Sequence, residues 1–184
     1  MPVRKAEAVW EGTLQDGKGT MKMASGAYEG QYSFSSRWHL AASHVRVWQA
    51  FEELLPSENP FVFWPGMRSE RRGEDIHVTA GSPVGYTLRF RVYDVDPTPM
   101  EQVTLLADGD LLGRATMQLG VVDDLNSTID VSWHVDVTQP WMRRMRFVLR
   151  PVFVLAHDAV MRAGERGLNG WLREQASRDS DPVG

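Results

Sequence analysis

The stretch that decides the fold is residues 127–175, which begins STIDVSWHVDV and continues into a long helical pattern. In its first eleven residues apolar and polar side chains alternate, so that Ile129, Val131 and Trp133 share one face. Strict alternation predicts a strand with one buried and one solvated face. The same alternation recurs upstream in residues 84–95, 101–107 and 111–122, and shorter strands are expected at 67–72 and 74–80. We therefore expect consecutive antiparallel strands over 67–138 that bury a single face.

A helix from about Pro140 to Gln175 is expected to cover that face, because a one-sided sheet has to pack against another layer. Proline suits a first helical turn, whereas Pro151 inside the helix predicts a kink or a break. The apolar positions recur roughly at helical spacing, with slippage. They are Trp141, Met145, Val148, Val152, Leu155, Ala159, Met161, Leu168, Trp171 and Leu172.

The segment before this sheet predicts a strand followed by a short helix. Residues 31–41 alternate cleanly, and Trp38 lies on their apolar face. Ser43 is placed to cap a helix with Val47, Trp48, Phe51, Leu54 and Leu55 at helical spacing, which Pro56 ends. Residues 61–64 are short enough to form one helical turn. Further upstream, residues 4–14 and 18–25 predict two strands joined by a turn at Asp16-Gly17.

The length of 184 residues corresponds to about one domain with an extension. We expect residues 1–30 to form a β-strand extension, residues 31–176 to form the body, and residues 177–184 to be a disordered tail. The predicted class is α+β, with a curved antiparallel sheet around a long C-terminal helix. A curved sheet that wraps one helix leaves space between the two layers, and such a space favours an apolar cavity.

Composition narrows the functions that fit. The chain has no cysteine, which excludes thiol nucleophiles, disulfides and thiolate metal sites. The formal net charge of −4 argues against general nucleic-acid binding. The basic residues Arg68, Arg71 and Arg72 alternate with acidic neighbours, which is typical of a solvated strand pair. No apolar run is long enough for a transmembrane helix and no signal peptide is visible, so a cytoplasmic location is expected.

The five histidines, His39, His44, His77, His134 and His157, do not predict a metal site, since none of their spacings is that of metal ligands. His39 and His134 fall on the polar faces of their strands, where surface exposure is expected. His157 lies beside the apolar stripe of the long helix and is the best candidate for a polar group at the cavity, against a plain role on the helix surface. Phosphate-binding and dinucleotide-binding motifs are absent, so no cofactor is expected.

Seven tryptophans are many for this length, and core packing is the favoured explanation for any one of them. The alternative is the wall of an apolar pocket, to which Met117, Met145 and Met161 would add adaptable lining. The candidates are the large residues on the inward faces of the predicted elements. The predicted ligand-binding residues are Trp48, Trp64, Tyr86, Phe90, Met117, Trp133, Trp141, Met145, Val148, Val152 and His157.

Residues from about 36 to 175 resemble the START-like (SRPBCC) superfamily, and in particular its polyketide cyclase/dehydrase-like branch. The resemblance rests on SRWHL at 36–40, VRVW at 45–48, FWP at 63–65, LGRA at 112–115, the strand at 127–135 and GERGL at 164–168. It implies the helix-grip fold. It does not imply one function, because this superfamily includes lipid carriers, cyclases, hormone receptors and hydroxylase subunits.

Residues 5–37 resemble the N-terminal strands of OsmC-like hydroperoxide peroxidases, through AVWEG at 8–12, GKGT at 17–20 and YSFSSR at 32–37. In that family an arginine at the position of Arg37 assists a reactive cysteine. Thiol peroxidase activity is excluded here because the chain has no cysteine. The strands of residues 1–30 are therefore expected to be structural, and either to extend the sheet or to pair between the subunits of a homodimer.

The sequence leaves three functions open. The first is binding or transport of a small hydrophobic molecule such as a lipid, a polyketide or an isoprenoid. The second is an enzyme of the aromatase/cyclase type, for which no catalytic residues can be assigned. The third is a protein-interaction module without a ligand. A cavity between sheet and helix distinguishes the first two from the third, which requires a filled core and an exposed apolar patch.

Overall fold

The structure is a computed structural model that describes residues 6–11, 18–23, 32–82, 85–137 and 140–179, with the side chains of 35–82, 85–134 and 155–179. Two helices and nine strands make up these ranges. In chain order they are β1 (Ala6–Glu11), β2 (Lys18–Met23), β3 (Tyr32–Leu40), α1 (His44–Leu54), β4 (Met67–Arg72), β5 (Asp75–Gly81), β6 (Thr87–Thr98), β7 (Gln102–Gly109), β8 (Leu111–Val121), β9 (Ser127–Val137) and α2 (Pro140–Asp179).

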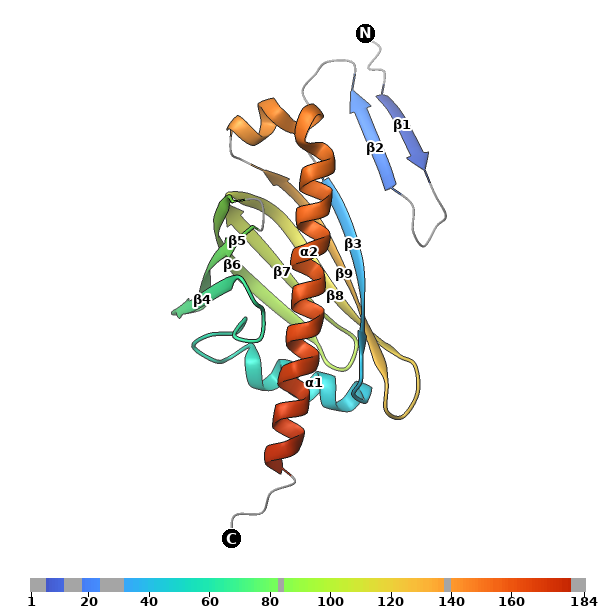
Figure 1. The fold of residues 1–184 in the computed structure, drawn as a ribbon, viewed down its shortest axis with the longest axis vertical. Coiled ribbons are helices and arrows are strands. Elements are labelled where there is room, and N and C mark those ends of the chain that lie inside the picture. Colours follow the sequence, from blue (N-terminus) through green and yellow to red (C-terminus); the bar gives the residue numbers. More distant parts are fainter. Residues whose placement is uncertain (1–5, 12–17, 24–31, 83–84, 138–139, 180–184) are drawn as a thin grey trace.

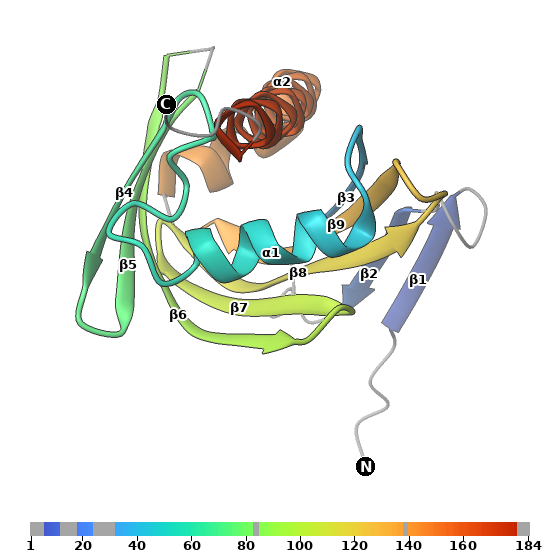
Figure 2. The same cartoon turned by 90° about the horizontal axis from the view of Figure 1, so that it is seen from below.

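Seven strands form one antiparallel sheet in the order β3-β9-β8-β7-β6-β5-β4. Each strand from β4 to β9 lies beside the next one in the chain, and β3 is the edge strand that pairs with β9. The sheet is strongly curved, with α1 across one end of its hollow and α2 along the open side (Figures 1 and 2). This confirms the predicted α+β class, the antiparallel strands and the position of the long helix on their apolar face.

The strands β1 and β2 pair with each other from Ala6↔Met23 to Glu11↔Lys18 and form a separate two-stranded sheet. In this single chain they therefore do not extend the seven-stranded sheet, which was one of the two expectations for residues 1–30. The turn expected at Asp16-Gly17 lies outside the described residues.

At both ends of α1, side chains form hydrogen bonds with backbone groups that have no partner within the helix. Ser43 is the N-cap, as predicted, and its Oγ accepts from the backbone N–H of Arg46 at 3.3 Å. At the other end the Arg71 guanidinium donates to the carbonyl oxygens of Leu55 and Ser57. Arg71 thus satisfies free carbonyls at a helix C-terminus, where a cation is favoured, while Arg68 and Arg72 are solvated as expected.

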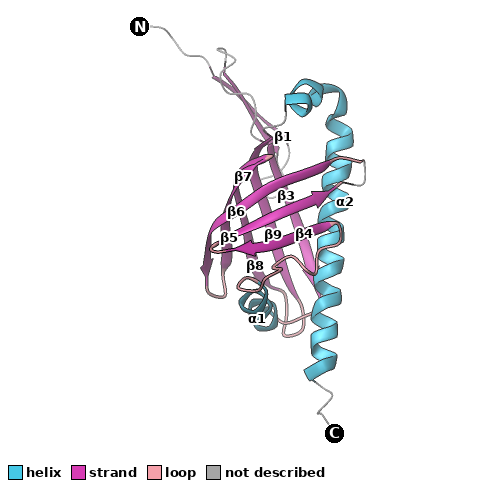
Figure 3. Ribbon diagram, turned by 90° about the vertical axis from the view of Figure 1, so that its left-hand side faces the viewer, coloured by secondary structure: helices cyan, strands magenta, loops and turns pink. Residues whose placement is uncertain are grey.

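The helix α2 is assigned without interruption through Pro151. Its first turns nevertheless run across the direction of the remainder, at the end of the sheet far from α1 (Figures 1 and 3). A change of direction is what an interior proline predicts. The helix continues to Asp179, so the first three residues of the expected tail are helical, and residues 180–184 lie outside the described range.

The second half of α2 is attached to the end of β3 by side chains. The backbone N–H of His39 donates to Glu165 Oε1 at 2.8 Å, and that of Ala41 donates to Asn169 Oδ1 at 2.9 Å. Asn169 Nδ2 in turn donates to the carbonyl oxygen of His39 at 2.9 Å. These bonds satisfy backbone groups at the edge of the sheet and fix the position of the helix along it.

Three local expectations are modified. Residues 61–64 form a hydrogen-bonded turn, with Trp64 N donating to Phe61 O at 2.9 Å, and are not assigned as helix. Val121 continues the apolar face of β8 in sequence, yet it is 70% exposed because it lies at the hairpin tip beyond the core. Leu155 belongs to the predicted apolar stripe of α2, but it is 67% exposed.

Candidate functional site

The inner face of the sheet carries different aromatic groups near α1 and far from α1. Near α1 the space is filled by aromatic rings, with the Trp38 and Trp64 centroids 5.0 Å apart in an edge-to-face arrangement. Gly164 of α2 lies directly on this pair, since a Cβ added there would be 2.5 Å from Trp64 Cε2 and 2.8 Å from Trp38 Cζ2. This close approach packs α2 directly onto the two rings.

Two of the predicted ligand-binding tryptophans belong to this filled end. Trp64 is 4% exposed, and its Nε1 donates to the carbonyl oxygen of Val160 at 2.9 Å. Trp48 is buried on α1, and its Nε1 donates to Glu52 Oε1 at 2.8 Å. Both indole N–H groups therefore have protein acceptors, and both rings fit the alternative of core packing.

Trp38 was not among the predicted site residues, although its strand face was read correctly. It is 1% exposed, and within the described part of the chain its buried indole N–H has no hydrogen-bond acceptor. A buried donor without a partner costs about 1–3 kcal/mol. The sequence signal was the alternation of β3, but a missing acceptor is visible only in three dimensions.

Two large aromatic residues lie on the inner face toward the end of the sheet far from α1. Phe90 of β6 and Trp133 of β9 are in edge-to-face contact, with ring centroids 6.5 Å apart. Their strands are three spacings, or about 14 Å, apart in a flat sheet. The rings meet because the inward positions between them, on β7 and β8, carry small residues. These positions are Ala107, Gly109, Gly113 and Ala115.

These small residues are a second feature that the sequence analysis missed. Trp133 pairs with Ala115 in the β8–β9 ladder, and Phe90 pairs with Gly109 in the β6–β7 ladder. Each small side chain leaves room for a neighbouring ring above the backbone, and Ala107 and Ala115 are each 1% exposed. In the sequence, β7 carries Ala107 and Gly109 on its apolar face and β8 carries Gly113 and Ala115. Only the register of the two strands shows that these four residues are neighbours.

The other predicted ligand-binding residues occupy different places. Met117 is buried on the inner face of β8, beside Val131 of β9. Tyr86 is half-buried in the turn that precedes β6. His157 is half-buried on α2, with its Nε2 screened from solvent. The side chains of Trp141, Met145, Val148 and Val152 lie outside the described residues.

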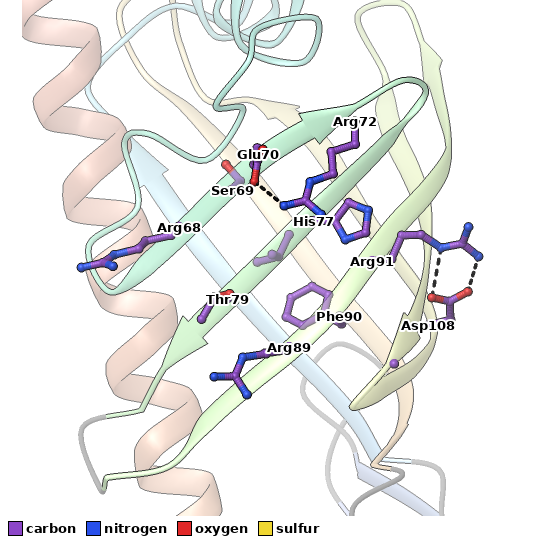
Figure 4. A pocket seen from close by; sticks show the side chains of 12 residues that line it. Arg68, Ser69, Glu70, Arg72, His77, Thr79, Arg89, Phe90, Arg91 and Asp108 are labelled. Atoms are coloured by element: carbon purple, nitrogen blue, oxygen red, sulfur yellow. Dashed lines mark hydrogen bonds and ion pairs between the residues drawn. The ribbon is translucent and has the colours of Figure 1, made fainter.

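A groove of about 720 Å³ lies on the opposite, outer face of the sheet, across β4 to β7 (Figure 4). Some of its charged side chains form ion pairs: Arg91 binds Asp108 and also Asp75 at 3.0 Å, and Arg72 binds Glu70 at 2.8 Å. The hydrogen bond from Arg91 lowers the pKa of the Asp108 carboxyl. This groove is polar and differs in place and in chemistry from the predicted apolar cavity.

The described residues contain no group of three histidine or carboxylate side chains placed to hold a metal ion. His39 and His134 are exposed on the outer face of the sheet. No helix within the described ranges is both long enough and apolar enough to cross a membrane. The described inner face carries apolar side chains, and the aromatic contact between its strands is that of Phe90 with Trp133.

Comparison with solved structures shows the fold. The chain aligns with a START superfamily protein from Mycobacterium smegmatis at a TM-score of 0.58 and 13% identity, over 79% of this chain and 99% of that one. It aligns with the Zhui aromatase/cyclase of a Streptomyces species at 0.59 and 12%, over 79% and 96% of the two chains. A protein from Thermus thermophilus gives 0.58 and 14%, over 78% and 99%.

The architecture is thus the helix-grip fold of START-like proteins, as the sequence resemblance implied. Identities of this size establish the fold and carry no function. No protein-family model matches the chain, and no curated protein sequence matches it.

Proposed function

We propose that this protein binds a small hydrophobic molecule between the sheet and α2, at the end of the sheet far from α1. The observation that carries the proposal is the pairing of Phe90 and Trp133 above four small residues of β7 and β8. The half-buried Trp133 ring lies beside the glycine and alanine residues of β7 and β8, and it presents a flat apolar surface to a ligand. Lipids, polyketides and isoprenoids are the chemical classes that such a surface fits.

The two ends of the inner face support this location. At the end near α1, Gly164 touches both tryptophan rings and the core is closed. Met117, the next inward position after Ala115 toward the α1 end, adds a flexible side chain that adapts to varied ligands. His157 is half-buried on α2, four residues before buried Met161, and we assign it to the head group of the ligand.

The first test uses Trp133→Ala. Truncating a tryptophan in a packed core costs about 3–5 kcal/mol. At a wall that borders a ligand space the cost is smaller, because fewer contacts are lost. We expect a modest loss of unfolding free energy together with a loss of binding of a fluorescent fatty-acid or polyaromatic probe. A large stability loss, with no probe bound by the wild type, would refute the proposal.

The second test fills the space. Ala115→Leu adds three carbons to the inner face beside Trp133, while Thr116→Leu places the same side chain on the outer face of the same strand. With a ligand space present, Ala115→Leu abolishes probe binding at little cost in stability, and Thr116→Leu leaves binding unchanged. In a closed core the same alanine change overpacks the site and costs about 1–3 kcal/mol.

A further inference from the structure

A row of three polar residues crosses the outer face of the sheet, within the groove over β4 to β7. Arg68 of β4 pairs with Thr79 of β5, and Thr79 pairs with Arg89 of β6. Neighbouring strands are about 4.8 Å apart, which puts the backbones of the two arginines roughly 10 Å apart, on either side of Thr79. Figure 4 shows both guanidinium groups extending from this row in the same direction. An arginine side chain spans half of that distance, so both groups can reach one anion placed over Thr79.

The carboxylates of the groove are bound by arginines outside this row. Arg91 donates from two nitrogens to the two oxygens of Asp108, and it also binds Asp75 at 3.0 Å. Arg72 binds Glu70 at 2.8 Å. Within the described part of the chain, the guanidinium groups of the row form no ion pair, and both of its arginines are exposed. The row therefore offers two positive charges to a partner outside the chain.

The remaining polar groups beside the row leave its guanidinium groups accessible. On the turn between β7 and β8, Asp110 Oδ2 accepts from the backbone N–H of Arg89 at 2.8 Å. This bond uses the backbone of Arg89 and not its guanidinium. Thr79 is half-buried in the middle of the row, and its hydroxyl makes no hydrogen bond to any described residue. It supplies a neutral donor between the two cations.

The number of donors in the row favours a phosphate group over a carboxylate. Arg91 and Asp108 show how this groove binds a carboxylate, since one guanidinium occupies both of its oxygens. Two guanidinium groups and a hydroxyl offer more donors than two oxygens accept. A phosphate monoester carries three terminal oxygens and a charge of about −1.5 to −2 at pH 7, which matches both arginines and the hydroxyl of Thr79.

We infer that Arg68, Thr79 and Arg89 bind the phosphate group of a sugar phosphate. The groove of about 720 Å³ extends from the row over His77 of β5 and the paired carboxylates beside it, which offer donors and acceptors to hydroxyl groups. The outer positions of β4, β5 and β6 hold no aliphatic side chain. This face therefore lacks the apolar surface that the acyl chains of a phospholipid would require.

This site goes beyond the proposed function and is independent of it. The row lies on the outer face, whereas Phe90 and Trp133 meet on the inner face of the same sheet. Neither the sugar phosphate nor its test involves the apolar space, so either proposal can fail without the other.

The test is a titration of the full chain at constant ionic strength, followed through its amide NMR signals. The probes are glucose 6-phosphate, inorganic phosphate, glucose and acetate. Glucose 6-phosphate is expected to shift the signals of Arg68, Thr79 and Arg89, and also that of His77, and to saturate at millimolar concentration. Inorganic phosphate is expected to shift the three signals of the row with lower affinity. Glucose and acetate are expected to leave all of these signals unchanged.

Variants then assign the binding to the row. Arg68→Gln and Arg89→Gln are each expected to weaken the binding of glucose 6-phosphate at least about tenfold, because each removes charge-assisted hydrogen bonds. Thr79→Val keeps the shape of the side chain and is expected to weaken binding about threefold. The matched control, Arg114→Gln, removes an exposed arginine from the outer face of β8 and should retain binding. The thermal melting of every arginine variant should match that of wild type, because the side chains are exposed.

Three results would overturn the inference. The first is the absence of glucose 6-phosphate binding to wild type. The second is an equal loss of binding in Arg114→Gln, which would mean general attraction between charges. The third is acetate or inorganic phosphate bound as tightly as glucose 6-phosphate, since the row would then not select a phosphate group or the groove would not hold the sugar.

Discussion

At the scale of single residues, close packing in this fold depends on glycines in α2 where no side chain fits. A Cβ at Gly164 would be 2.5 Å from Trp64, and one at Gly167 would be 1.8 Å from the carbonyl oxygen of Phe63. Gly170, in the same helix, has no atom within 4 Å of an added Cβ. The helix therefore contains two glycines that its packing requires and one that it does not.

This contrast gives a matched pair of substitutions. Gly164→Ala is expected to lower the free energy of unfolding by about 1–3 kcal/mol, because the methyl group displaces the packed tryptophan rings. Gly170→Ala is expected to raise it by about 0.4–1 kcal/mol, since it removes backbone freedom from the unfolded chain at no steric cost. Chemical denaturation of both variants measures the difference. Equal effects of the two changes would contradict the packing described here.

At the scale of elements, the contact between α2 and β3 is both polar and apolar. The apolar part is the approach of Gly164 to Trp38 and Trp64, and the polar part is the set of bonds from Glu165 and Asn169 to the end of β3. Asn169 accepts from the backbone N–H of Ala41, just after β3, and donates to the carbonyl oxygen of His39 in β3. It sets the position of the helix, which burial alone does not specify.

Asn169→Ala is expected to destabilise the fold by about 1–3 kcal/mol, because two hydrogen bonds to β3 are lost. The amide hydrogen of Ala41 should then exchange faster with solvent. Amides in the centre of the sheet should still exchange only through global unfolding. Glu174→Ala, an exposed change on the same helix, is the control and should stay within about 0.5 kcal/mol of wild type. Unchanged exchange at Ala41 would show that the helix is positioned by packing alone.

At the scale of the whole molecule, the seven-stranded sheet and α2 form one hydrophobic core. The strands β1 and β2 pair with each other and not with that sheet, and β3 stands at the edge of the sheet with β9 as its neighbour. An edge strand exposes unpaired backbone groups, which invite association. Residues 1–30 are thus expected to affect association more than folding.

Deletion of residues 1–30 is expected to preserve a cooperative thermal transition, because the paired strands β3 to β9 and both helices lie after them. The expected cost is association between subunits, since β3 is already an edge strand in the full chain and the deletion bares no further edge of that sheet. Calorimetry of the shortened chain checks the first point and light scattering the second. Loss of cooperative melting would show instead that β1 and β2 belong to the core.

Local patterns in the sequence were sufficient to predict the elements and their buried faces. A period of two specifies which face of a strand is apolar, and a cap such as Ser43 specifies where a helix starts. These features depend on neighbours within a few residues, so one chain is enough to recognise them. The seven strands, the short helix and the long terminal helix followed from such patterns, and the START-like resemblance agrees with the observed fold.

Only the tertiary structure decided which side chains meet. Phe90 and Trp133 lie on strands that are not adjacent, and their contact depends on the register of four strands and on small residues between them. The apolar series of α2 looked continuous in sequence, yet Leu155 is exposed while Ala156 is buried. Alternation identifies an apolar face but not what covers it, because the covering layer is set by the curvature of the sheet and the close packing of α2 at Gly164.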